Sequence, residues 1–175
     1  MKTLMLLPML LIPVLLSAQN TVSVLSSNVL QGNDLYIEID IENQDEIVAF
    51  QMDIHYPPEW ELIDYKLDRG VDHIVNCTQV DQGVVRVLAY SMTNKAFLHN
   101  KGVVLGIRLK GDNIGKHKVA LTGVMLSDRF GNPVDVETDN GYITIHTGRA
   151  RRYGTITAAV AIISVLTIIT LNRKR

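Results

Sequence analysis

The strongest constraint on the fold is a strict two-residue alternation in residues 35–42. Large aliphatic residues alternate there with polar or amphipathic ones, in the order Leu35, Tyr36, Ile37, Glu38, Ile39, Asp40, Ile41 and Glu42. Successive side chains of a β-strand point to opposite faces, so this pattern predicts a strand with one buried face and one solvated face. The turn-forming "QGND" before it and "QDE" after it set its limits.

Similar segments recur along the chain, and they predict an all-β domain. Turn signals recur about every 8–12 residues and the connections are short. No segment predicts an amphipathic helix longer than two turns. These features predict an antiparallel β-sandwich or barrel. Within 60–68, Trp60, Leu62 and Tyr65 are expected to anchor the strand in the core. The nine predicted strands are 21–30, 35–43, 47–56, 60–68, 73–80, 85–92, 103–111, 117–126 and 141–147.

One predicted strand, "VRVLAYSM" at 85–92, has two largely apolar faces. Its inward face would carry Val85, Val87 and Ala89, and its outward face would carry Arg86, Leu88, Tyr90 and Met92. An outward face with three largely apolar side chains in a row needs a cover. Either the loop "NKAFLHNKG" at 94–102 folds over it, or another protein binds there.

The N-terminal residues 1–19 predict a secretory signal peptide. Lys2 supplies a positive start, residues 4–16 are apolar, and "LLSAQN" offers small residues for cleavage. An uncleaved membrane anchor is the alternative, but Pro8 and Pro13 disfavour a spanning helix.

Residues 154–171 contain no charge, and they predict a transmembrane helix. Eighteen helical residues span about 27 Å, close to the hydrocarbon thickness of a bilayer. A short basic stalk (148–153) precedes the helix and a basic tail (172–175) follows it. With a cleaved signal peptide, the tail is cytoplasmic and the N-terminal domain extracellular, in a single-pass protein of the cell membrane. A buried core helix or a processed sorting tail is the alternative, but the basic flanks disfavour the first and no LPxTG-like motif supports the second.

The remaining domain, residues 20–147, is acidic and has a single cysteine. It carries ten Lys and Arg against 18 Asp and Glu, a net charge of −8. This charge disfavours nucleic acid and anionic membrane surfaces as partners, because both attract cationic patches. Cys77 excludes an intramolecular disulfide, and it is expected to be a small buried residue.

No motif for catalysis or metal binding is present. The sequence has no GxSxG, HExxH, CxxC, phosphate loop or calcium-binding EF-hand loop, and its histidines are scattered. Asp53 and His55 share one predicted face and in principle could bind a metal or exchange protons, but a solvated polar face is the simpler interpretation. We therefore predict no enzyme, no catalytic residue, no metal and no cofactor.

In their order and spacing, several segments resemble the cohesin family, the modules that bind dockerins in cellulosome-type assemblies. The resemblance covers about residues 21–145. It departs from the family at Tyr56-Pro57-Pro58, where Tyr-Asp-Pro is usual, and in having a single module with a membrane anchor. The segments that carry it are "QGNDLYIEIDIEN", "IVAFQMDIHY", "SDRFGNPVDV" and "GYITI".

The resemblance implies a nine-stranded jelly-roll β-sandwich in which one flat sheet face binds a dockerin. Segments 47–56, 73–80 and 85–92 would lie on that face. It further implies a non-catalytic receptor at a prokaryotic cell surface, whose partner is a dockerin-containing protein such as a polysaccharide-degrading glycoside hydrolase. A carbohydrate-binding or adhesive module is the alternative. The predicted partner-binding residues are Gln51, Asp53, His55, Asn76, Thr78, Arg86, Leu88, Tyr90 and Met92.

Overall fold

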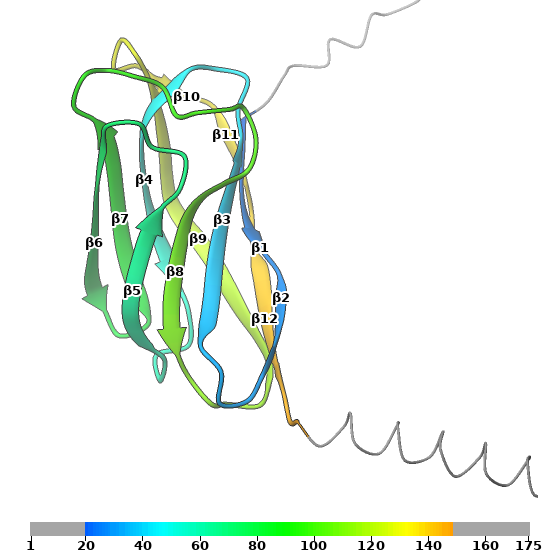
Figure 1. Ribbon diagram of the computed structural model, residues 1–175. Coiled ribbons are helices and arrows are strands. Elements are labelled where there is room, and N and C mark those ends of the chain that lie inside the picture. The colour runs from blue at the N-terminus through cyan, green and yellow to red at the C-terminus, as the bar shows by residue number, and fades with distance from the viewer. Residues whose placement is uncertain (1–19, 149–175) are drawn as a thin grey trace, which may run out of the picture.

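The computed structural model describes residues 20–148, which form two β-sheets packed face to face (Figure 1). One sheet has the strand order β11-β1-β3-β8-β5, and the other has the order β2-β12-β9-β4-β7-β6, with β10 paired to β9. The predicted all-β sandwich is confirmed. The strands are β1 (Asn20–Leu25), β2 (Ser27–Leu30), β3 (Leu35–Glu42), β4 (Ile47–His55), β5 (Glu61–Leu67), β6 (His73–Asp81), β7 (Val84–Ser91), β8 (Val103–Lys110), β9 (Gly115–Asp128), β10 (Pro133–Val134), β11 (Val136–Asp139) and β12 (Gly141–His146).

The core lies between the sheets and is built by the two-residue alternation of the strands. The aliphatic residues of β3 are buried on the inner face, as are alternate residues of β4, β7 and β8. Trp60 is 2% exposed and closes one end of the core, as predicted. This arrangement leaves the other face of each of these strands free to meet solvent or a partner.

The number of strands differs from the nine predicted, because the described residues form twelve. The first predicted strand, 21–30, is interrupted at Ser26, so that β1 belongs to one sheet and β2 to the other. The turn-rich stretch after β9 holds two short strands, β10 and β11, which pair with β9 and β1 respectively. Short strands of two to four residues leave too few positions for an alternation to be recognised.

The prediction for Tyr65 was wrong. Tyr65 lies opposite the buried Ile107 and so on the inner side of its strand, but β5 is the last strand of the sheet, and at this edge Tyr65 is 37% exposed. Among residues 20–148, no helix is long and apolar enough to cross a membrane. The predicted signal peptide (1–19), membrane helix (154–171) and tail (172–175) lie outside the described residues, as does all of the stalk after Gly148.

Candidate protein-binding surface

The outer face of strands β6, β7, β4 and β9 brings together eight of the nine predicted binding residues. They project outward because their neighbours in each strand point into the core or toward it. We call this face the candidate surface. Gln51, Asp53 and His55 come from β4, Asn76 and Thr78 from β6, and Arg86, Leu88 and Tyr90 from β7.

Strand register arranges these side chains in rows across the sheet. Leu88 lies opposite Asn76 on one side and Gln51 on the other. In the next row, Arg86 lies opposite Thr78 and Asp53. Directly opposed residues on one face of a sheet have their Cβ atoms within about 5.5 Å. The predicted residues therefore form one continuous patch.

The centre of the candidate surface is apolar and solvent-exposed. Leu88 is 39% exposed and Tyr90 is 38% exposed. Two further apolar side chains, outside the predicted set, extend the patch: Ile74 lies opposite Tyr90, and Met125 lies opposite Gln51. Both are exposed large hydrophobic residues. Such a cluster on one sheet face is typical of a protein-binding site.

Ile74 could have been found from sequence, whereas Met125 could not. Ile74 precedes Asn76 by two residues in the same strand, so it shares its face. Met125 follows a bulge, because the residues opposite Asp53 and Gln51 are Thr122 and Met125. Two residues along β4 are therefore matched by three residues along β9. The extra residue on β9 means that the positions facing outward after the bulge are those that continued alternation would have placed inward.

Met92 lies apart from the rows, one residue beyond the end of β7, and is 63% exposed. It follows Ser91, whose hydroxyl donates a 2.7 Å hydrogen bond to Asp72. Thr93 also donates to that carboxylate, and these two hydrogen bonds lower the pKa of Asp72. The residues around Met92 thus fix a tight turn at the edge of the candidate surface.

The loop at 94–102 does not cover the candidate surface. Its Phe97 is buried in the core against Phe50, with ring centroids 5.4 Å apart. The backbone amide of Phe97 donates to the carbonyl of Ile47, which holds the loop against the end of the sandwich. Leu88 and Tyr90 therefore stay exposed, and an intramolecular cover by this loop is excluded.

An ion pair borders the apolar centre. The Arg86 guanidinium donates hydrogen bonds of 2.7 and 2.8 Å to the two carboxylate oxygens of Asp53. These hydrogen bonds are the main reason that the pKa of Asp53 is lowered. The neighbouring His55 ring nitrogen Nε2 lies 2.7 Å from the Thr122 hydroxyl. Both oxygens of Asp53 are thus engaged by Arg86, and no cluster within residues 20–148 has three side chains placed to hold a metal.

A hollow of about 280 Å³ lies within the candidate surface, above β4. It arises where the small side chain of Ala49 lies between the larger side chains of the neighbouring strands. No charged residue lines it. The lining residues are Ala49, Phe50, Gln51, Leu88, Met125, Ser127, Gly131 and Pro133.

Cys77 points away from the candidate surface and packs partly against the core. Burial raises the pKa of its thiol to about 12. The thiol therefore stays protonated near neutral pH, and a protonated thiol is a poor nucleophile. Cys77 is a packing residue on the inner side of β6.

The sequence matches no family model and no curated protein, but the structure matches solved cohesin modules. A non-cellulosomal cohesin from the archaeon Archaeoglobus fulgidus superposes with a TM-score of 0.66 at 23% identity, over 78% of this chain and 98% of that one. The fold is that of a cohesin module. The cohesin-fold resemblance seen in the sequence segments is therefore confirmed.

Two bacterial cohesins show the same relationship. One, from a type I cohesin–dockerin complex of Clostridium thermocellum, has a TM-score of 0.63 and 15% identity, over 73% of this chain and 99% of that one. The other belongs to a family 33 glycoside hydrolase of Clostridium perfringens, with a TM-score of 0.62 and 19% identity, over 74% and 96%. The described residues thus span nearly the whole length of a cohesin module.

Proposed function

We propose that the candidate surface binds a dockerin-bearing protein, noncovalently and without catalysis. The observation that carries this proposal is the exposed apolar cluster of Ile74, Leu88, Tyr90 and Met125 on one flat sheet face. Polar side chains surround it, and an apolar centre with a polar rim is the usual anatomy of a protein interface. Cohesins of the same fold have been solved in complex with dockerins.

The composition of the surface favours a protein partner over a sugar. Sugar sites need hydrogen-bonding groups beside an aromatic ring, whereas the exposed side chains that form the cluster with Tyr90 are apolar: Ile74, Leu88 and Met125. The hollow above Ala49 has no charged lining residue, so it suits an apolar side chain of a partner. Buried aromatic and aliphatic anchors in such pockets carry most of the binding energy of protein interfaces.

A charge at the centre of the apolar cluster provides the main test. We expect Leu88→Asp to weaken binding of a dockerin from the same genome by about 30-fold or more, because the new carboxylate would be buried without a partner. Ile63→Asp is the matched control, since Ile63 is 42% exposed on β5 of the other sheet. Isothermal titration with calcium present measures both affinities. Undiminished affinity in a folded Leu88→Asp variant would refute the proposed surface, and no binding by any dockerin of the genome would refute the function.

We further propose that the receptor is held at a prokaryotic cell surface by residues 154–171, after export directed by residues 1–19. The uncharged run and its flanking basic residues support this proposal. The full chain is expected to resist alkaline extraction from membranes and to be cleaved by protease added to intact cells. A chain ending at Gly148 should instead appear in the medium. Recovery of the full chain as a soluble protein would refute the anchor.

A further inference from the structure

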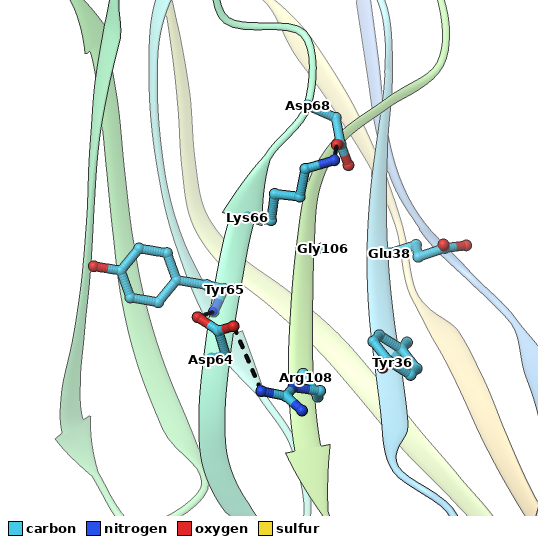
Figure 2. A pocket seen from close by; sticks show the side chains of 8 residues that line it. All are labelled: Tyr36, Glu38, Asp64, Tyr65, Lys66, Asp68, Gly106 and Arg108. Carbon is cyan, nitrogen blue, oxygen red and sulfur yellow. Dashed lines mark hydrogen bonds and ion pairs between the residues drawn. The ribbon is translucent and has the colours of Figure 1, made fainter.

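A second hollow lies on the outer face of the other sheet, on the opposite side of the sandwich from the candidate surface. Its volume is about 310 Å³, and it is formed by β3, β8 and β5 (Figure 2). Figure 2 shows Asp64 pointing toward Arg108 and the ring of Tyr65 pointing away from the hollow. The lining residues are Tyr36, Glu38, Asp64, Tyr65, Lys66, Asp68, Gly106 and Arg108.

Strand register explains the shape of this hollow. In one row, Arg108 on the central strand β8 lies between Tyr36 and Asp64. In the next row, Gly106 lies between Glu38 and Lys66. The second row therefore has side chains at both ends and none in the middle, and Gly106 is the floor of the hollow.

Neither backbone conformation nor packing requires a glycine at position 106. Gly106 does not have a positive φ, so an ordinary residue could adopt its conformation. A Cβ atom added there would meet no atom within 4 Å. Glycine in the interior of a strand weakens the strand, and it often marks a place where a ligand approaches the backbone closely. The open space above Gly106 is thus a feature that folding does not explain.

The two cations that line the hollow, Lys66 and Arg108, are already paired with carboxylates. Arg108 lies 3.5 Å from Asp64 and also contacts Asp34 at 3.4 Å, and Lys66 pairs with Asp68. An anion would therefore meet engaged cations and nearby carboxylates. Within the part of the chain that the structure describes, no three side chains on this face are placed to hold a metal. Binding of an apolar ligand would cost free energy, because the ligand would remove these charged groups from water.

A neutral, hydroxyl-rich ring suits all of these groups. The Tyr36 side chain is 50% exposed and offers an aromatic surface for the C–H face of such a ring. Hydroxyl groups can donate to the carboxylates of Glu38 and Asp64, and they can accept from the N–H groups of Arg108. Glycine at the floor lets the ring approach the sheet.

We propose that the hollow over Gly106 binds one sugar ring of a neutral polysaccharide. Its volume is at the lower end of the range of about 300–1,000 Å³ for small-ligand sites, so it suits a single unit of a longer chain. The two faces of the sandwich would then have separate tasks. One holds a protein partner, and the other holds the receptor against a polysaccharide.

The test is a titration of the full chain in a detergent without a sugar headgroup. The neutral probes are cellotetraose, xylotetraose, mannotetraose and laminaritetraose, and the acidic contrast is trigalacturonate. We expect saturable binding of at least one neutral probe in the micromolar-to-millimolar range, about −4 to −8 kcal/mol. We also expect Tyr36→Ala and Gly106→Val to weaken it about tenfold or more, by loss of stacking and by filling of the hollow.

Two controls separate binding from folding. Tyr142→Ala removes an exposed tyrosine from β12 of the other sheet and should leave sugar affinity unchanged. Gly106→Ser, whose added side chain is smaller, serves as a second variant if the valine prevents folding. Each variant should keep the dockerin affinity of the unmodified chain, because the candidate surface is on the other sheet.

The outcomes of this titration test only the proposed sugar site over Gly106. Failure of all four neutral probes to bind at about 10 mM, near the weakest measurable affinities, would overturn the proposal. Preference for trigalacturonate would overturn it too, as would unchanged affinity in folded Tyr36→Ala and Gly106→Val variants. None of these results bears on dockerin binding, which the Leu88→Asp variant tests separately.

Discussion

At the scale of single residues, Arg69 shows how a buried cation can hold a loop. Its side chain is buried and donates hydrogen bonds to backbone carbonyls, at 2.6 Å to Leu98, 2.8 Å to Ile41 and 3.0 Å to Gly102. It also donates to the side chain of Asn43. Burial lowers the pKa of Arg69, but an arginine remains protonated at any ordinary pH. The guanidinium thus helps to hold the loop that contains Leu98 and Gly102 against Ile41 of β3, together with the backbone hydrogen bond from the Ile41 amide to the Gly102 carbonyl.

We expect Arg69→Met to lower the free energy of unfolding by about 3 kcal/mol, because several buried carbonyl groups would lose their donor. Arg69→Lys should recover only part of this loss, since an ammonium cannot reach carbonyls in as many directions. Urea denaturation measures both variants. A loss below about 1 kcal/mol in Arg69→Met, the scale of one ordinary hydrogen bond, would mean that water satisfies these carbonyls.

His73 predicts a dependence of stability on pH. Its side chain is fully buried, with its ring centroid 3.8 Å from that of Phe97. Burial lowers its pKa, and the nearby Asp72 opposes this only in part. The unfolded chain therefore binds a proton at His73 more readily than the folded chain does, so stability falls as pH drops below about 6.5.

Urea denaturation at several values between about pH 7.5 and pH 5 measures this effect, and His73→Phe should reduce the slope. Aspartates with a lowered pKa, such as Asp53 and Asp128, contribute stability that is lost only as pH falls below about 4. The loss of stability caused by His73 therefore occurs at a higher pH than the loss caused by the aspartates, and the two can be measured separately. An unchanged slope in the His73→Phe variant would show that another group is responsible.

At the scale of elements, the long strand β9 depends on one bulge. Gly123 has a φ of 58° between Thr122 and Met125, at the point where the register with β4 shifts. A residue with a side chain is strained in this conformation by about 1–3 kcal/mol. The bulge turns Met125 toward the candidate surface, so this glycine links the path of the strand to the site.

We expect Gly123→Ala to lower the free energy of unfolding by about 1–2 kcal/mol, through backbone strain alone, because its Cβ would meet no atom within 4 Å. Gly106→Ala is the matched control. Gly106 is also uncrowded but has no positive φ, so the alanine should be neutral or slightly stabilising. Urea denaturation of the two variants compares them directly, and equal stabilities would contradict the assigned role of the bulge.

Bulges of this kind limit what could be predicted from the sequence. Alternation correctly gave the inward faces of β3, β4 and β7, because the pattern runs without interruption along these strands. It did not reveal Met125, because Met125 follows a register shift that reverses the alternation. Nor could it show that Tyr65 stays exposed, because that follows from the position of β5 at the edge of its sheet. It also could not show that β6, β7, β4 and β9 are neighbours, since strand pairing is set by contacts distant in sequence. The resemblance to cohesins supplied that order.

At the scale of the whole molecule, acidic charge is unevenly divided between the two outer faces. The five-stranded sheet carries many of the carboxylates on its outer side, among them Glu38, Glu42 and Glu137. The candidate surface has an uncharged centre, and its Arg86 and Asp53 neutralise each other. The net charge of −8 in the domain therefore acts mainly on the face away from the proposed partner.

This division predicts that dockerin affinity depends little on salt. Screening weakens interactions between exposed charges more than about 10 Å apart, and burial of apolar side chains is not screened. We expect the dissociation constant to change less than about threefold between about 50 and 500 mM sodium chloride, a range that shortens the Debye length about threefold. Surface plasmon resonance across this range measures it. A weakening of about tenfold or more would show that charged contacts, rather than Leu88 and Tyr90, carry the binding energy.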